Sequence, residues 1–471
     1  MQGGAEISPA RRLFGTDGVR GLANTEPMTP ETALLLGRAI GHLVVRGGGV
    51  PGHILVGKDT RASGEMLEAA LVAGICSMGV STLAAGVLPT PGVAFLTRRL
   101  AAAAGAVVSA SHNPFADNGI KFFAHNGLKL PDAAELEIER WVLDSDLRNV
   151  RPTHADIGRV RQLDDAAARY AASLRDTLPS GCRLDRLHIV IDCAHGAAFR
   201  VGPELLSALG ARVTAVGADP DGTNINSGCG AAAPQLLQNT VRAQQAHLGI
   251  ALDGDADRVI LVDETGAVVD GDEVLAILAD DMLQRGVLRQ ATVVATVMSN
   301  IGLEVALRAR GAHLVRTPVG DRHVAEQMVR QGYNLGGEQS GHIILMDHNT
   351  TGDGLLAALA VLRLLIGRER PLSELKRVMT KFPQTLVNLR VARRRELLSL
   401  QPVRETIERI AAELDDRGRV VVRYSGTEPL VRVMVEGEDA ARVQACAEEI
   451  AAVIKTHAGE EVAESCLLKG E

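Results

Sequence analysis

One arrangement of residues occurs three times along this chain: an apolar strand, a turn of small polar residues, a helix rich in Ala and Leu, then a glycine and a second apolar strand. The three copies begin at HILVGKDTR, LHIVIDCAHG and ATVVATVMSNIG, and their helices are followed by Gly79, Gly210 and Gly311. Strands that alternate with helices form right-handed βαβ units, and the resulting mainly parallel sheets bind ligands at the carboxyl ends of their strands. The repeat therefore predicts three related α/β domains.

The 471 residues suffice for several domains. We place the three α/β domains at residues 10–157, 158–262 and 263–375. After Pro383 the pattern changes to short apolar strands and to helical stretches at 402–414 and 440–454, which predict a smaller α+β domain with an antiparallel sheet over 382–457. The predicted fold class is α/β, with three related domains of mixed, mainly parallel sheets and a fourth, smaller domain.

Charge and apolar patterning exclude several classes of protein. The net charge of −7 argues against a nucleic-acid partner, which would favour a basic surface. The longest apolar helical stretch, 355–366, contains Arg363 and is far shorter than the roughly 20 residues of a membrane span, so we expect no membrane association. The N-terminus lacks an apolar signal core and the six cysteines form no CxxC pair, so we expect a cytoplasmic protein with reduced thiols.

The segment DGDADR places Asp253, Asp255 and Asp257 at alternate positions between two apolar strands. Alternation directs the three carboxylates to one side of an extended loop, where they repel one another unless a cation neutralises them. Hard oxygen ligands favour Mg²⁺ over zinc, and the adjacent Arg258 is suited to a phosphate. The alternative is a solvated acidic turn.

The segment VVSASHNPFADNGIKFF ends a strand in a turn of Ser, His, Asn and Pro. Ser111 lies in this turn, where its hydroxyl could be phosphorylated and its phosphate oxygens could bind a metal. The neighbouring His112 suggests hydrolase-type activation, but no GxSxG motif surrounds the serine. An ordinary turn is the competing interpretation.

Three further segments suggest contacts with a phosphorylated sugar. RYSGTEPLVR combines two arginines with a Ser-Gly-Thr turn, as a phosphate-binding loop does, although a plain hairpin turn is the alternative. GGEQSGH offers Glu338, Ser340 and His342 in a glycine-rich loop suited to sugar hydroxyl and amine groups, or to a flexible structural loop. LFGTDGVRG ends in Arg20, which could contact a phosphate or belong to a hairpin.

Together and in this order, these segments resemble the α-D-phosphohexomutase family over nearly the whole chain. The resemblance implies three similar α/β domains and a fourth around a deep central cleft. It implies a phosphorylated Ser111, sugar contacts from Glu338 and Ser340, and one Mg²⁺ per chain. The implied Mg²⁺ ligands are Ser111, Asp253, Asp255 and Asp257. The implied phosphate-binding loop contains Arg423, Ser425, Gly426, Thr427 and Arg432.

Within the family, GEQSGH, SASHNPFADNGIKFF, GKDTRASGEMLEAAL and TPVGDRHV are similar to members that act on amino-sugar phosphates, and the last adds Arg322 as a substrate-binding candidate. The implied activity is that of an isomerase of amino-sugar metabolism that supplies cell-wall precursors. Phosphorylated Ser111 would convert glucosamine 6-phosphate through glucosamine 1,6-bisphosphate, also the activator, into glucosamine 1-phosphate. Candidates for proton transfer or charge stabilisation are Lys121, His342 and Arg20.

The other functions considered are mutase activity on glucose or mannose phosphates, a non-catalytic sugar-phosphate sensor, and a phosphatase. The only partners expected are the small-molecule amino-sugar phosphate and, as the oligomer considered, a second copy of the chain in a homodimer. Rotation of the last domain is expected to close the site.

Overall fold

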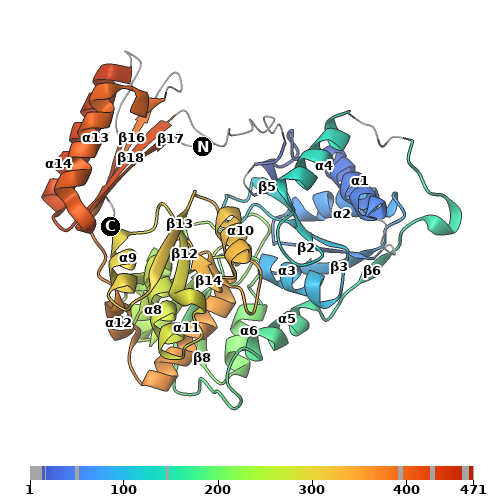
Figure 1. The fold of residues 1–471 in the computed structure, drawn as a ribbon. Helices are drawn as coiled ribbons and strands as arrows, with labels where there is room; N and C mark the ends of the chain where they lie inside the picture. Colours follow the sequence, from blue (N-terminus) through green and yellow to red (C-terminus); the bar gives the residue numbers. More distant parts are fainter. Residues whose placement is uncertain are drawn as a thin grey trace.

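The computed structural model describes residues 13–15, 17–47, 52–144, 147, 149–390, 396–424, 430–458 and 466–469. Its strands form four separate sheets, one after another along the chain. Three of the sheets, with their helices, make up one large body, and the last sheet stands at a corner of that body (Figure 1). This arrangement confirms the predicted fold class of three α/β domains followed by a smaller one.

The first domain contains a six-stranded sheet in the order β1-β5-β4-β2-β3-β6. Strands β2, β3, β4 and β6 are parallel, whereas β1 and β5 are antiparallel to their neighbours. Helices α1 and α2 pack so closely that a Cβ on Gly37 would lie 2.1 Å from the Leu71 carbonyl oxygen. The elements are β1 (Val19–Leu22), α1 (Pro30–Arg46), β2 (Ile54–Lys58), α2 (Gly64–Cys76), β3 (Thr82–Val87), α3 (Thr90–Arg99), β4 (Ala104–Val108), β5 (Asp117–Ala124), α4 (Asp132–Asp144), η1 (His154–Asp156) and β6 (Val160–Gln162).

The second domain has a five-stranded sheet in the order β11-β10-β9-β7-β8, in which β7, β8 and β9 are parallel. Strands β9 and β10 form an antiparallel pair, so the loop that joins them leaves and re-enters the same edge of the sheet. The elements are α5 (Ala166–Arg175), β7 (His188–Asp192), α6 (Val201–Ala208), β8 (Arg212–Val216), α7 (Gln235–Gln244), β9 (Leu248–Leu252), β10 (Val259–Asp263) and β11 (Val268–Val269).

The third domain has a four-stranded sheet in the order β13-β12-β14-β15, with only β15 antiparallel. The apolar stretch 355–366 lies in helix α11 and is almost entirely buried, as expected of a core helix. No helix within the described residues is both long and apolar enough to cross a membrane. The elements are α8 (Gly271–Gln284), η2 (Arg289–Ala291), β12 (Thr292–Thr296), α9 (Ile301–Arg308), β13 (His313–Thr317), α10 (Asp321–Gln331), β14 (Leu335–Gly337), β15 (Ile343–Leu345), α11 (Gly354–Arg368), α12 (Leu372–Leu375) and η3 (Lys376–Val378).

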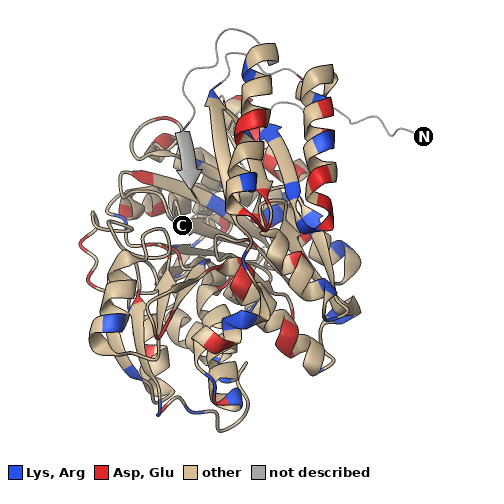
Figure 2. Ribbon diagram, turned by 90° about the vertical axis from the view of Figure 1, so that its left-hand side faces the viewer, with Lys and Arg blue, Asp and Glu red and all other residues tan. Residues whose placement is uncertain are grey.

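The fourth domain is an antiparallel sheet in the order β17-β18-β16-β19, covered on one face by two helices. The exposed faces of these helices carry acidic and basic residues in ion pairs, as solvent-facing helices do (Figure 2). The elements are β16 (Gln384–Arg390), η4 (Leu397–Ser399), α13 (Gln401–Leu414), η5 (Asp415–Arg417), β17 (Arg419–Tyr424), β18 (Leu430–Glu436), α14 (Ala440–Ala458) and β19 (Cys466–Lys469).

The buried cores show which domains are joined most firmly. One continuous core includes Val93 of the first domain, Ile189 of the second and Leu356 of the third. The fourth domain has a core of its own. Its contacts with the third domain include a hydrogen bond from the Arg419 guanidinium of β17 to the Ser299 carbonyl oxygen (2.9 Å). Loops of the first three domains are therefore held in one packed unit.

Candidate active site

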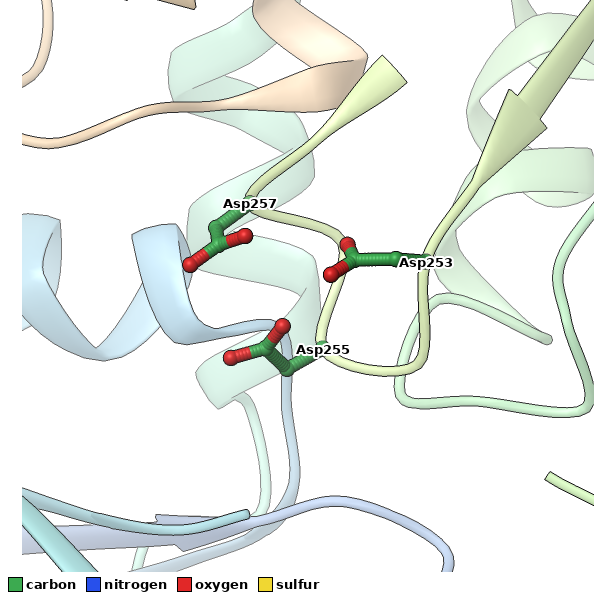
Figure 3. A group of neighbouring side chains, drawn as sticks. All are labelled: Asp253, Asp255 and Asp257. Atoms are coloured by element: carbon green, nitrogen blue, oxygen red, sulfur yellow. The ribbon is translucent and has the colours of Figure 1, made fainter. Parts of the chain in front are cut away.

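The loop between β9 and β10 brings Asp253, Asp255 and Asp257 together. One carboxylate oxygen from each lies within 4.8 Å of the others, and all three side chains are buried. Figure 3 shows the carboxylates turned toward a common space. Ala256, in the same loop, has a left-handed backbone conformation (φ +59°). The Oδ1 atoms of Asp255 and Asp257 are buried without a hydrogen-bond partner. Buried carboxylate oxygens that lack donors fit a small hard cation, so this cluster is suited to a metal ion.

Ser111 lies directly beside this cluster. The turn that follows β4 carries the buried serine, and its hydroxyl donates a 2.7 Å hydrogen bond to Asp253 Oδ2. Its backbone has φ +53°, a left-handed conformation that is uncommon for residues other than glycine and is concentrated at functional sites. The buried Arg61 supports the turn by donating to the carbonyl oxygens of Ser111 (3.0 Å) and Asn113 (2.8 Å). A nucleophilic hydroxyl and a candidate metal site from two domains thus meet.

Lys121 links the aspartates to the first domain. Its Nζ lies 2.8 Å from Asp255, 3.7 Å from Asp257 and 3.3 Å from Asp17. Burial acts to lower the pKa of Lys121, but the carboxylates of Asp17, Asp255 and Asp257 outweigh it and raise the pKa well above its usual value. Lys121 is therefore a fixed positive charge at the edge of the cluster. Arg20 also pairs with Asp17, so two candidate residues share one carboxylate.

The ion pairs continue into the third domain through residues that the sequence analysis did not select. Lys129 lies 2.5 Å from Asp17 and 2.6 Å from Asp321, the first residue of α10. Asp17 and Asp321 lie inside the motifs LFGTDGVRG and TPVGDRHV, so the sequence indicated that these two segments belong to the site. Lys129 belongs to no motif. Alternating charges therefore connect the first domain to the third beside the site.

His342 lies at the end of this series of charges. Its Nδ1 is 3.7 Å from Asp257 and its Nε2 is 3.5 Å from Asp321. The backbone amide nitrogen of Gly352 lies 2.9 Å from Nε2. Burial acts to lower the pKa of His342, but the carboxylates of Asp257 and Asp321 outweigh it and raise the pKa to about 9. His342 thus lies beside Asp257, with its orientation set by the loop before α11, and its role remains a prediction.

Two of the remaining sugar-binding candidates lie on the loop between β14 and β15. Glu338 accepts a hydrogen bond from the Gly320 amide at 3.1 Å, and Ser340 is exposed. A Cβ on Gly341 would lie 2.1 Å from the Val259 carbonyl oxygen, so this glycine permits the loop to pack against the start of β10. Glu338 also joins Asp257 and Asp253 in raising the pKa of Arg258, against the opposing effect of burial.

Arg322 has a different environment from the other candidates. Its guanidinium pairs with Glu135 at a buried position and with Asp132, both on α4 of the first domain. Its Nε is buried without a hydrogen-bond partner. The structure therefore places Arg322 in a contact between the first and third domains, and substrate binding by this residue remains a prediction.

The fourth domain contributes two arginines that face each other. Arg423 on β17 and Arg432 on β18 are directly opposed in the antiparallel register. Burial and the charge of Arg432 lower the pKa of Arg423. Like charges in opposed positions destabilise a sheet, and a bound anion would relieve this repulsion. The other three candidates of this segment, Ser425, Gly426 and Thr427, lie outside the described residues.

Comparison with known proteins gives matches along nearly the whole chain. Family models of phosphoglucomutase/phosphomannomutase match in chain order: domain I at residues 11–149, domain II at 168–266, domain III at 270–382 and the C-terminal domain at 386–453. A phosphoglucosamine mutase of Syntrophotalea carbinolica is 52% identical over 95% of this chain and 98% of its own length. Another, from an Anaeromyxobacter species, is 54% identical over 94% of this chain and 95% of its own length.

Solved structures show the same fold at lower identity. A phosphoglucomutase/phosphomannomutase family protein from Burkholderia thailandensis has a TM-score of 0.79 at 24% identity and covers 95% of this chain and 98% of its own. N-acetylphosphoglucosamine mutase of Aspergillus fumigatus, in complex with GlcNAc-6P and magnesium, has a TM-score of 0.65 at 17% identity and covers 94% of this chain and 96% of its own.

Proposed function

This chain belongs to the phosphoglucomutase/phosphomannomutase family, and we propose that it acts as a phosphoglucosamine mutase, an isomerase that interconverts glucosamine 6-phosphate and glucosamine 1-phosphate. The proposal includes a phosphoserine at position 111 and glucosamine 1,6-bisphosphate as the intermediate. It also includes a cytoplasmic location, which agrees with the free state of the five described cysteines.

One observation carries the proposal: the 2.7 Å hydrogen bond from the Ser111 hydroxyl to Asp253, inside a cluster of three buried carboxylates. A serine in an ordinary turn has no need of three acidic neighbours from another domain. A phosphoryl group on that oxygen would bring its own negative charge to the carboxylates, and the two can coexist only if a cation lies between them.

The proposed cation is Mg²⁺, held by Asp253, Asp255, Asp257 and the phosphorylated Ser111. When bound, it would neutralise charge on the transferring phosphoryl group. The oxygen ligand set suits this ion, and the Aspergillus relative was solved with magnesium. Lys121, fixed by Asp17 and Asp255, adds positive charge beside the cluster.

The reaction proceeds as two transfers that balance. In the first, the bond between phosphorus and Ser111 Oγ breaks, a bond from phosphorus to the free sugar hydroxyl oxygen forms, and the proton that this hydroxyl loses is matched by one that Ser111 Oγ gains. The bisphosphate then turns around. In the second transfer, the bond between its other phosphorus and the sugar oxygen breaks, a bond from that phosphorus to Ser111 Oγ forms, Oγ loses its proton and the sugar oxygen gains one. Phosphoryl transfer depends mainly on positioning and charge stabilisation, which the converging side chains of three domains provide.

The remaining candidates receive roles in substrate binding. Arg423 and Arg432, with Ser425, Gly426 and Thr427, would hold the phosphate that is not reacting. Glu338 and Ser340 would contact the sugar, and Arg258 would contact the reacting phosphate. Arg20 and His342 stand near enough to the aspartates to assist charge stabilisation or proton transfer. Arg322 would have to exchange Glu135 for a substrate phosphate.

The decisive experiment is a coupled assay for glucosamine 1-phosphate, with and without glucosamine 1,6-bisphosphate, on the wild type and on Ser111→Ala. We expect Ser111→Ala to lose both turnover and the mass of one phosphoryl group in intact-mass spectra. The control is Ser173→Ala, because the Ser173 hydroxyl donates to the Tyr170 carbonyl oxygen within its own helix α5. Near-normal turnover of Ser111→Ala would refute the proposal, and release of inorganic phosphate instead of transfer would indicate a phosphatase.

A further inference from the structure

The backbone of the Ser111 turn is held from two sides. Arg61, of the same domain, donates to the carbonyl oxygens of Ser111 and Asn113 at 3.0 and 2.8 Å. Asn226, from the second domain, donates to the same two oxygens through its side-chain Nδ2, at 2.9 and 3.0 Å. The two carbonyl groups on either side of His112 are therefore fixed by donors that belong to different domains.

This double support matters because the Ser111 conformation is not one that a serine adopts easily. A left-handed φ of +53° at a residue with a Cβ costs on the order of 1 kcal/mol and persists only where the surroundings determine it. The carbonyl group that receives the two donors belongs to the same residue as the nucleophilic Oγ. Loss of one donor would let the peptide rotate and would move Oγ away from Asp253.

The position of Asn226 is itself set by buried contacts. The backbone amide of Asn226 donates to the Ala194 carbonyl oxygen at 2.9 Å. The turn at Ala194 is held by the buried Asp192, which accepts from the amides of Ala194 (2.9 Å) and Gly230 (2.7 Å). Asn226 has φ +59°, a conformation that asparagine tolerates better than most residues. The side chain is thus presented to the Ser111 turn by a rigid part of the second domain.

The carboxylate loop lies against the same contact. A Cβ on Gly254, between Asp253 and Asp255, would stand 2.6 Å from the Ser111 carbonyl oxygen and 2.8 Å from Asn226 Nδ2. Gly254 therefore leaves room for the Asn226 amide and the Ser111 turn to approach the candidate metal loop. Asn226 lies at the meeting point of the two loops whose separation decides whether Ser111 can react.

We propose that Asn226 is a positioning residue for phosphoryl transfer, acting across the contact between the first two domains by fixing the Ser111 turn against the carboxylate loop. This inference rests on the proposed function. Asn226 needs no contact with the sugar for this role, so its loss should lower kcat rather than raise KM. A displacement of about 1 Å at a reacting atom lowers the rate by about 100-fold.

The test compares Asn226→Gly with Asn224→Gly in the intact enzyme. Glycine keeps the left-handed backbone of position 226 without strain, so this change removes only the side chain. Asn224 is in the same loop, but its Nδ2 donates to the Asp219 carbonyl oxygen and not to the Ser111 turn. We expect Asn226→Gly to lower kcat about 100-fold with KM within about threefold of wild type, and Asn224→Gly to remain close to wild type.

A second variant covers the case in which Asn226→Gly does not fold. Asn226→Asp preserves the shape of the side chain, and aspartate, like asparagine, tolerates a backbone φ of +59°. An ionised carboxylate, however, cannot donate a hydrogen bond to the two carbonyl oxygens. It should lose at least as much kcat, whereas wild-type kcat in either folded variant would overturn the inference. An equal loss in Asn224→Gly would also overturn it, because the effect would then belong to the loop as a whole. Absence of mutase turnover in the wild type would instead refute the proposed function.

Discussion

Replacing Asp253 by Asn should make the metal-free protein more stable and at the same time remove its stabilisation by Mg²⁺. The three carboxylates lie within 4.8 Å of one another. At this separation, and with an effective dielectric constant of about 20, each pair of unit charges repels by about 3.5 kcal/mol. Burial and the charges of Asp257 and Asp255 therefore raise the pKa of Asp253 well above its usual value. Among the described residues, Asp253 is the member of the cluster without an ion pair within 4 Å, since Lys121 contacts Asp255 and Asp257.

The neutral amide would remove the free-energy cost of either charging or protonating this buried carboxyl group, and it would retain an acceptor oxygen for the Ser111 hydroxyl. Part of the gain is offset by lost attraction to Arg258, whose charge lies near Asp253. A net gain of a few kcal/mol without metal is expected. Mg²⁺ at 100 times its dissociation constant stabilises the wild type by about 2.7 kcal/mol, which corresponds to roughly 3–4 °C in the unfolding midpoint of the packed unit formed by the first three domains.

Differential scanning calorimetry with EDTA and with a series of Mg²⁺ concentrations measures both effects. We expect the midpoint of the wild type to rise with Mg²⁺ and that of Asp253→Asn to stay nearly constant from a higher starting value. Asp185→Asn, an exposed change in the same domain, should respond to Mg²⁺ like the wild type. An Asp253→Asn protein that gains as much from Mg²⁺ as the wild type, or that melts lower in EDTA, would refute the electrostatic reasoning.

Two further predictions concern other parts of the molecule. Burial raises the pKa of Asp272 to about 7, with contributions from the charges of Asp270 and Glu436, and Lys381 lies near enough for Asp272 to raise its pKa. The pKa of Asp272 in the folded state is higher than its value of 3.8 in the unfolded chain, so the folded state keeps the proton over a pH range in which the unfolded chain has lost it. The stability of the wild type should therefore fall as pH rises from about 4 to about 7. Asp272→Asn should reduce this pH dependence and should be more stable than the wild type by a few kcal/mol at pH 8. Thermal unfolding of both proteins at pH 5 and pH 8 measures the difference, and an unchanged dependence of stability on pH in the variant would contradict the raised pKa of Asp272. Arg423→Ala should raise KM about 10- to 100-fold, because it removes a charge-assisted contact with the phosphate. Arg417 pairs with Glu438 at the surface, so Arg417→Ala should leave KM unchanged. Equal KM values for the two variants in steady-state kinetics would show that Arg423 does not bind the phosphate.

Local patterns in the sequence predicted the elements of the fold closely. The stretches 402–414 and 440–454 became α13 (Gln401–Leu414) and α14 (Ala440–Ala458), since apolar periodicity is a property of neighbouring residues. The alternate spacing of Asp253, Asp255 and Asp257 predicted that their carboxylates share one side, and they do. Periodicity did not reveal that β1 and β5 run antiparallel in the first sheet, because strand direction depends on how distant segments pair.

The contacts between loops were beyond such reasoning, because they join residues that no spacing relates. Lys129 meets Asp17 across 112 positions, and Arg322 meets Glu135 across 187. Asn226 reaches Ser111 from 115 positions away, and its segment, TNINSG, has the composition of any polar turn. A motif identifies the group that reacts because its chemistry is local. The geometry that makes it react is set by side chains from other domains, so substitutions at Lys129 or Asn226 can test parts of the mechanism that the motifs do not contain.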